Sequence, residues 1–492
     1  MNELDDLAPG PGSTINLSLI SHTNAGKTTL ARTLLGRDVG EVRDAAHVTD
    51  LATGYVLVQQ GDDTLMLWDT PGFGDTARLL SRLKMSGNPI GWFLSQVWDR
   101  WRERPLWSSQ QAVKNAREQA DVILYLVNAA EDPASASYVG LEMEVLGWVG
   151  KPVVVLLNQI GPPREDVSDE IARWSGIGPE GLVRAVLPLD AFARCWVQEG
   201  ALLDGVAPIL EQDKQPAMER LRARWEDLND ARFRSSMEVL GRYLARAVRD
   251  REPVEEPGWQ DKLAGALSRR GGENAVARKA MGALATRLSE ATTRSTDELI
   301  RLHGLSGQAT RKVLERVGDD YAHAAKTPEG AAAALGGLLS GAVGGLAADL
   351  AAGGLTLGGG MIVGGILGAL GATGVARGVN LASGEDASTM RWSYDFLERL
   401  TVTALLRYLA VAHFGRGRGE WSEGEHPAFW QPIVEQAVAA QAEGLKRLQK
   451  STAKNDTSAD EAELQFTALV ELGARQVLAR LYPEAASRLL RA

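Results

Sequence analysis

A strand, a loop of small residues and a helix follow one another near the N-terminus, and this combination constrains the fold most. Alternating apolar residues at 15–20 predict a strand, and the leucines from Leu30 onward begin a helical spacing. The loop between them reads Ser21-His-Thr-Asn-Ala-Gly-Lys-Thr28. Backbone N–H groups of such a loop face an anion, and a lysine adds positive charge. The sequence therefore predicts a nucleotide phosphate site, rather than an ordinary strand-to-helix turn, built from Asn24, Ala25, Gly26, Lys27, Thr28 and Thr29.

A second motif follows a predicted β-hairpin. Residues 54–60 and 64–69 flank Gly61-Asp-Asp63, and the second strand ends in Asp69-Thr-Pro-Gly72. Beside a phosphate loop, a carboxylate such as Asp69 can hold Mg²⁺ together with the Thr28 hydroxyl, and the Gly72 amide can sense a γ-phosphate. Apolar runs at 121–127 and 152–157, with helical segments between them, indicate a mostly parallel sheet covered by helices on both faces.

Over about residues 14–210 these motifs resemble the Era/TrmE/septin-like branch of bacterial P-loop GTPases. The resemblance implies slow hydrolysis of GTP to GDP with Mg²⁺, and it makes Thr49 the switch I threonine that closes on the metal. It also places Asn158 and Gln159 at the start of the motif that reads the base.

The position after Gly72 departs from the family pattern. Small GTPases usually carry a glutamine there to orient water, whereas this chain has Phe73. Some relatives without the glutamine use K⁺ held by an asparagine at the position of Asn24, and switch I completes that site when two nucleotide domains meet. We therefore expect potassium-stimulated, dimerisation-assisted hydrolysis that involves Lys27, Asn24, Thr49 and Gly72; the alternative is that Asn24 only shapes the loop.

The base-reading motif is incomplete. The family pattern is Asn-Lys-x-Asp, but the chain reads Asn158-Gln-Ile-Gly161, and Gly161 offers no carboxylate to guanine. Glu165 or Asp166 could substitute if the loop folds back. GTP is the first choice because of the resemblance, and ATP stays open.

Composition limits the surroundings in which the chain works. The single cysteine, Cys195, suits a reducing cytoplasm. The N-terminus, Met-Asn-Glu-Leu-Asp-Asp, is acidic and has no apolar run, so we expect no secretory signal there, and residues 1–13 are expected to be flexible. The net charge is −10, so the basic excess typical of nucleic-acid binders is absent and we expect no nucleic-acid partner.

An aromatic segment lies within the predicted nucleotide domain, residues 14–212. An insertion at about 80–120 places Phe93, Val97 and Trp101 on one face of a predicted helix. This segment could pack in a core, act as a lever from switch II, or lie on a membrane surface.

Residues 213–492 are predicted to form an all-α domain, with helices such as Met218–Val248, Ser388–His413 and Ala459–Leu481. Residues 330–376 contain one charge, Asp349, and small residues recur there every four positions. The two apolar segments are long enough for a helical hairpin that inserts in a membrane; the alternative is a tightly packed soluble hairpin buried within the α domain. The resemblance extends to relatives that carry a C-terminal helical domain of unknown function with such a hairpin.

Three functions remain open. The first is a nucleotide-switched, membrane-associated GTPase, cytoplasmic and either peripheral or hairpin-inserted at the inner membrane, with a lipid or membrane-protein partner and a homodimer formed through the nucleotide domain. The second is a soluble GTP-dependent assembly or maturation factor. The third is a weakly active pseudo-switch with relaxed base specificity, which Phe73 and Gly161 would permit.

Overall fold

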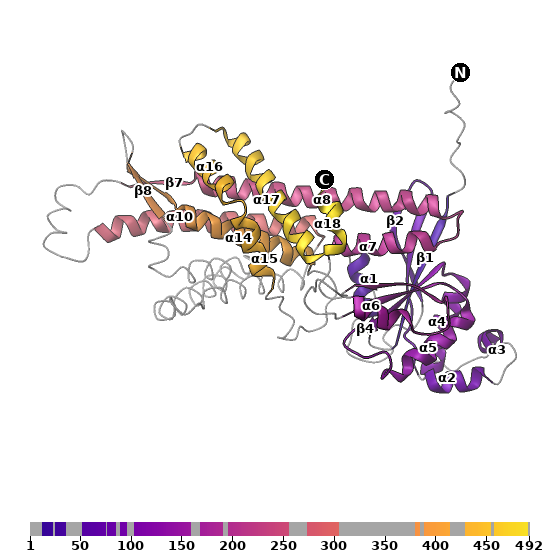
Figure 1. The fold of residues 1–492 in the computed structure, drawn as a ribbon. Helices are drawn as coiled ribbons and strands as arrows, with labels where there is room; N and C mark the ends of the chain where they lie inside the picture. Colours follow the sequence, from indigo (N-terminus) through magenta and orange to yellow (C-terminus); the bar gives the residue numbers. More distant parts are fainter. Residues whose placement is uncertain are drawn as a thin grey trace, which may run out of the picture. The chain divides into compact units, whose positions relative to one another are not determined.

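The chain divides into two compact units in a computed structural model (Figure 1). The first unit contains residues 1–231, 413–427 and 481–488, and the second contains 232–412, 428–480 and 489–492. The structure describes residues 12–22, 25–35, 52–74, 76–84, 89–95, 103–158, 168–189, 195–254, 273–304, 379–383, 388–413, 429–453 and 457–490.

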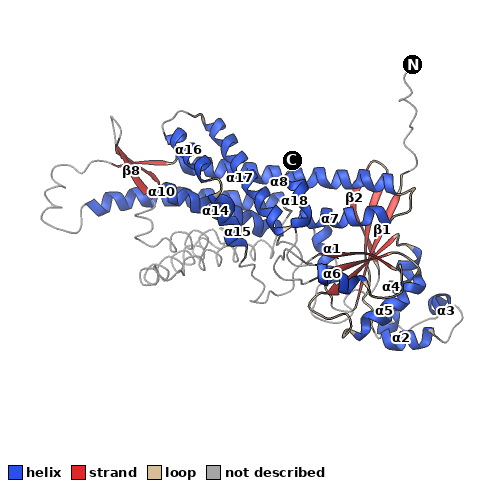
Figure 2. Ribbon diagram, in the orientation of Figure 1, coloured by secondary structure: helices blue, strands red, loops and turns tan. Residues whose placement is uncertain are grey.

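A six-stranded sheet with the order β2-β3-β1-β4-β5-β6 forms the centre of the first unit (Figure 2). The five strands other than β2 run parallel, and β2 pairs antiparallel with β3. Parallel strands end at the same edge, so the loops after β1, β3 and β5 lie on one side of the sheet. The strands are β1 (Thr14–Ser21), β2 (Thr53–Gln60), β3 (Asp63–Asp69), β4 (Val122–Asn128), β5 (Val153–Asn158) and β6 (Val183–Pro188).

Helices cover both faces of this sheet. One face packs against α1, α7 and the start of α8 through residues such as Leu30, Leu203 and Leu221. The other packs against α2 to α6 through residues such as Leu79 and Met143. Each of these leucines contributes roughly 1.5–3 kcal/mol by burial. The helices are α1 (Lys27–Leu35), α2 (Thr76–Leu83), α3 (Pro89–Ser95), α4 (Arg104–Glu118), α5 (Ser137–Val149), α6 (Ser168–Ser175), α7 (Trp196–Val206) and α8 (Gln215–Arg249).

The predicted insertion contains α3 and α4. Ile90 and Phe93 of α3 are buried in the core of the first unit, and the Gln110 amide of α4 donates to the Phe93 carbonyl at 2.7 Å. Val97 and Trp101 lie outside the described residues. The described part of the insertion therefore packs as core.

The C-terminal end of the chain completes the first unit. Residues 481–488 follow helix α17 (Ala459–Leu481) and belong to the first unit. They include the short helix η2 (Pro483–Ala485) and most of the short helix α18 (Ala486–Leu489). The Arg488 guanidinium pairs with Glu226 at 2.8 Å and with Asp204 at 3.3 Å. Tyr482 contacts His413 with 2.6 Å between the hydroxyl and Nε2.

The second unit is mostly helical. Its helices, besides the end of α8, are α10 (Glu273–Leu302), α14 (Tyr394–His413), α15 (Trp430–Ala439), α16 (Ala442–Ala453) and α17. It also contains an antiparallel sheet with the order β7-β9-β8, which was not predicted (Figure 1). Its strands are β7 (Arg251–Val254), β8 (Val379–Ser383) and β9 (Ser388–Trp392).

The predicted helix Ser388–His413 is wrong in its first part. Residues 388–392 form β9, and α14 begins only after Ser393, whose hydroxyl accepts a hydrogen bond from the Phe396 N–H at 3.2 Å. This hydroxyl caps the helix start and ends the strand. The prediction that this part of the chain is mostly helical is confirmed, but the described residues also include the three-stranded sheet.

The predicted apolar hairpin, residues 330–376, lies outside the described residues. Within the part of the chain that the structure describes, no helix is both long enough and apolar enough to cross a bilayer.

Candidate nucleotide site

The phosphate loop connects the end of β1 to the start of α1. Gly26 has φ +92°, a left-handed conformation that favours glycine, and a Cβ there would lie 3.5 Å from the Asn158 amide nitrogen. The chain then turns directly into α1 at Lys27. The helix N-terminus therefore points its free N–H groups at the space beside the loop.

Lys27 is buried at this turn. Its ammonium donates to the Ser21 hydroxyl at 2.8 Å and to the His22 carbonyl at 3.4 Å. Burial lowers the pKa of Lys27 to about 8, although the negative charges of Asp69 and Glu142 raise it. Ser21, which stands where the family has its first loop glycine, is thus a partner of the lysine.

Thr28 and Asp69 meet next to the lysine. The Thr28 hydroxyl donates to Asp69 Oδ2 at 2.9 Å, and Asp69 Oδ1 is buried without a hydrogen-bond partner among the residues that the structure describes. Burial raises the pKa of Asp69, and the positive charge of Lys27 opposes this effect.

These two residues fit a magnesium ion. A hydroxyl beside a carboxylate with one unsatisfied oxygen is the donor set that this hard cation prefers, with phosphate oxygens and water supplying the rest. No group of three or more His, Cys, Asp or Glu among the described residues could hold a metal by itself.

The segment after Asp69 is fixed against the phosphate loop. Thr70 donates its hydroxyl to the Leu19 carbonyl at 2.5 Å, and the Phe73 N–H donates to the Ser21 carbonyl at 2.9 Å. Gly72 is buried beside them. The Phe73 ring is fully buried in the core, so this residue anchors the segment where the family has its glutamine.

The base-reading motif is described only at its first residue. Asn158 ends β5, and its amide donates to the Ala25 carbonyl at 3.4 Å. The structure therefore brings together residues from three strand ends: Ala25, Gly26, Lys27, Thr28, Asp69, Gly72 and Asn158, with Thr29 buried in α1 behind them.

The other predicted site residues lie outside the described residues: Asn24, Thr49, Gln159, Gly161, Glu165 and Asp166. Their predicted roles stay predictions.

Sequence reasoning missed two residues at this site, His22 and Glu142. His22 Nδ1 lies 2.7 Å from Glu142 Oε1, although the two are 120 residues apart. Glu142 is fully buried in α5. The available signal was the position of Glu142 between Leu141 and Met143 in a helix that is mostly apolar, although the same helix also contains Glu144.

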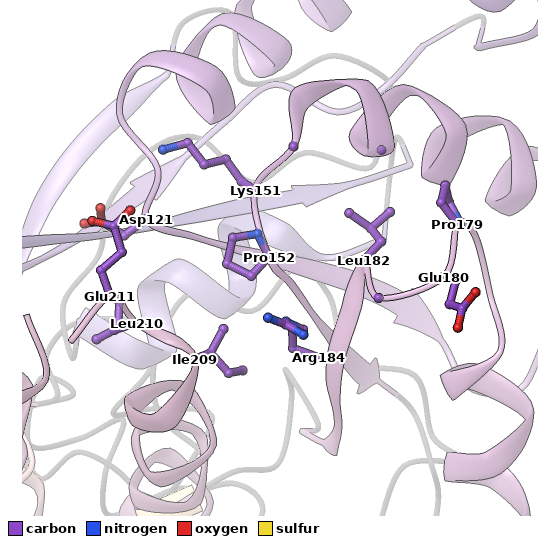
Figure 3. Close-up of a pocket in the computed structure, with 13 residues that line it drawn as sticks. Asp121, Lys151, Pro152, Pro179, Glu180, Leu182, Arg184, Ile209, Leu210 and Glu211 are labelled. Carbon is purple, nitrogen blue, oxygen red and sulfur yellow. The ribbon is translucent and has the colours of Figure 1, made fainter.

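A separate cavity opens at the opposite edge of the sheet (Figure 3). It has a volume of about 500 Å³ and is lined by Asp121, Pro152 and Leu182, which precede β4, β5 and β6, among other residues. Lys151 and Arg184 line it together with Glu180 and Glu211, so its charges are mixed (Figure 3). This cavity is distinct from the nucleotide site.

The doubly covered sheet, the phosphate loop and the Asp69 motif define an Era-like P-loop GTPase domain, followed by a mostly helical region. Residues 16–159 match the family described as 50S ribosome-binding GTPase. Residues 182–474, more than half of the chain, match the family described as a domain of unknown function (DUF3482), and the chain belongs to this family. The match of residues 16–159 supports a GTP-binding protein of the switch type.

Solved structures that align with part of this chain include those of Era and NFeoB. Era from Aquifex aeolicus bound to GDP and AlF₄⁻ is 19% identical, with a TM-score of 0.30, over 40% of this chain and 57% of that one. NFeoB from S. thermophilus bound to a GTP analogue is 18% identical, with a TM-score of 0.24, over 51% of this chain and 79% of that one. This chain thus spans little more than half the length of the Era structure.

Proposed function

We propose that the chain hydrolyses GTP slowly at the loop of residues 21–29 and uses the nucleotide state of a domain at 14–212 as a switch. The observation that carries this proposal is the pair of buried charges on Lys27 and Asp69, with the half-buried Thr28 hydroxyl beside them, at the carboxyl edge of the sheet. A buried ammonium neutralises phosphate charge more effectively than an exposed one, because less water screens it.

Each residue of the group has one role in this proposal. Lys27 binds the β- and γ-phosphates, and Thr28 and Asp69 would hold a Mg²⁺ ion, which would supply positive charge beside the phosphates. The Gly72 amide binds the γ-phosphate, and Thr49 closes on the metal. Asn158 and Gln159 face the base.

Hydrolysis by purified protein tests this proposal. Phosphate release from GTP should fall to background in Lys27→Ala and in Asp69→Asn. Asp63→Asn is the matched control, because Asp63 is a buried carboxylate at the other end of β3 and pairs with Arg220 at 2.7 Å. Wild-type protein that binds nucleotide without turnover would instead support the pseudo-switch. Two measurements show whether the site prefers guanine or adenine. GTP and ATP are titrated separately, and the nucleotide that co-purifies with the protein is identified.

Potassium dependence is the next part of the proposal. Phe73 is buried in the core and cannot orient water, so another group must supply the missing charge or positioning. We assign this role to K⁺ held by Asn24 in a dimer of nucleotide domains. Turnover should rise with protein concentration and should be faster in K⁺ than in Na⁺; equal rates in both salts would refute it.

The helical region carries the membrane part of the proposal. Residues 330–376 have the length and small-residue spacing of a hairpin that enters a bilayer. Co-sedimentation with anionic liposomes should be lost when 330–376 are deleted.

A second candidate is a soluble assembly factor, since residues 16–159 match a family described as ribosome-binding. Co-sedimentation with large ribosomal subunits in a GTP-dependent manner, without liposome binding, would favour this function instead.

A further inference from the structure

His22 connects the phosphate loop to helix α5. Its Nδ1 lies 2.7 Å from Glu142 Oε1, and its ring stacks on Tyr138 with 4.3 Å between ring centroids. Its carbonyl accepts a hydrogen bond from the Lys27 ammonium at 3.4 Å. A displacement of His22 therefore moves an acceptor of the lysine that binds phosphate.

Glu142 is a fully buried carboxylate, and burial of a charge is costly unless hydrogen bonds compensate it. Besides His22, it accepts from the Tyr125 hydroxyl at 2.6 Å and from the Thr76 hydroxyl at 3.2 Å. Its charge also reaches Lys27. The three donors come from the phosphate loop, from β4 and from the start of α2.

Thr76 belongs to the segment that follows the predicted γ-phosphate sensor Gly72. It is the first residue of α2, and its hydroxyl also lies 3.3 Å from the Gly74 carbonyl. The Gly74 N–H donates to Ser109 in α4 at 3.1 Å. A shift of this segment toward a γ-phosphate would therefore change the Thr76 contact with Glu142.

We propose that Glu142 is a positioning residue that couples the phosphate loop, through His22, to the switch II segment, through Thr76. This coupling rests on the proposed function. It explains how the phosphate loop would respond to the presence of a γ-phosphate. Glu142 touches neither nucleotide nor metal in this proposal. Because Oε1 receives both the His22 and the Thr76 contacts, loss of one contact frees the carboxylate to reorient toward the other.

The test is a double-mutant cycle on the ratio of two dissociation constants, that of a non-hydrolysable GTP analogue and that of GDP. Fluorescent derivatives of both nucleotides are titrated into the full chain. His22→Phe keeps the stacked ring but removes the nitrogen, and Thr76→Val removes only the hydroxyl. Each variant should change the ratio about fivefold or more, the lower end of typical coupling between sites. The double variant should match a single one within about twofold.

Thr33→Val is the matched control, since Thr33 is a buried threonine of α1 in the same unit, and its hydroxyl donates to the Thr29 carbonyl of the same helix at 2.7 Å. It should leave the ratio unchanged. Glu142→Gln should change the ratio of dissociation constants as much as each single variant does. A thermal melt shows whether this variant folds. If it does not fold, the double-mutant cycle of His22 and Thr76 still tests the coupling.

The outcomes separate the coupling from the function. Multiplicative effects of His22→Phe and Thr76→Val, or equal changes in both dissociation constants, would overturn the coupling while nucleotide binding stands. Wild-type protein that binds neither nucleotide would overturn the proposed function.

Discussion

At the residue scale, the site contains charges that the protein keeps away from water. Lys27 is buried with a lowered pKa, and Asp69 is buried with a raised one, so each charge depends on the other. Neither group gains hydration in the folded chain. Phosphate and Mg²⁺ are the charges best suited to complete this pair.

Nucleotide affinity should depend on pH above neutrality. The pKa of Lys27 falls from 10.5 to about 8 in the folded chain, and the ammonium is the form that binds phosphate. The affinity for GDP should therefore fall as the pH rises above about 8, by up to about tenfold per pH unit. Titrations of fluorescent GDP between about pH 7 and 9.5 measure this, since the range brackets the shifted value.

The lowered pKa of Lys27 also determines how the free energy of unfolding changes with pH. Between about pH 8 and 10.5 the unfolded chain holds a proton that folded Lys27 has lost, so this group makes the free energy of unfolding rise with pH in that window. Lys27→Arg tests the pH dependence of GDP affinity. Its side chain stays charged over this pH range, so its dissociation constant for GDP should not change with pH. If the dissociation constant of the variant changed with pH as much as that of the wild type, another group would cause the effect.

The sequence predicted one part of the site and missed another for a physical reason. Gly26, Lys27, Thr28 and Asp69 lie in local motifs with fixed spacing, so the pattern alone placed them. His22 and Glu142 are joined only by the packing of α5 on the sheet, 120 residues away, which no local pattern records.

At the element scale, helices α10 and α14 of the second unit share a buried polar contact. The Arg407 guanidinium donates through Nη1 to the Ser295 hydroxyl at 2.9 Å and the Thr296 hydroxyl at 2.8 Å, and it lies 4.6 Å from the centre of the Tyr243 ring. Among the described residues, its Nε and Nη2 are buried without hydrogen-bond partners, and no carboxylate pairs with this charge.

Replacing this charge should not weaken the second unit. Ser295 and Thr296 also donate to the Thr292 carbonyl, so they stay satisfied without the guanidinium. Arg407→Met should leave the free energy of unfolding unchanged or raise it by about 1–4 kcal/mol. Thr296→Val removes one acceptor of the buried charge and should lower it by about 1–3 kcal/mol.

Urea unfolding of the two variants, followed by far-ultraviolet circular dichroism, measures both effects. A loss of stability in Arg407→Met larger than that in Thr296→Val would show that the charge itself stabilises the packing of the two helices.

Helices and strands of this unit differed in how well the sequence predicted them. The helix predicted at Ala459–Leu481 agrees with α17 because its apolar spacing is long and local. β9 was missed because five residues carry little periodicity. Of its two partners, β8 is equally short, and β7 lies more than a hundred residues earlier.

At the scale of the whole molecule, the first unit is assembled from separate stretches of the chain. Residues 481–488 pack in the first unit, where Tyr482 is buried and its hydroxyl contacts His413. The domain bounds 14–212 and 213–492 follow from local strand and helix patterns along the sequence, which cannot show that a late segment packs against an early one. They stay a prediction for the nucleotide-binding part.

Removing a buried side chain from residues 481–488 should destabilise the first unit. Tyr482→Ala removes a buried aromatic side chain and should lower the free energy of unfolding by about 3–5 kcal/mol. Leu490→Ala is the control, because Leu490 is 59% exposed and its loss should change little. Loss of bound fluorescent GDP on heating reports the first unit; equal melting of both variants would contradict the role of this segment.

The returning segment also sets an order of events during synthesis. A nascent chain can pair the strands of the first unit early, because β1 to β6 are complete by Pro188. The residues that cover α7, however, emerge almost three hundred residues later, after the second unit has been made. Cys195 and the apolar residues of α7 therefore remain uncovered on one side throughout translation of the second unit, and a chaperone that binds exposed apolar surface has its longest opportunity there.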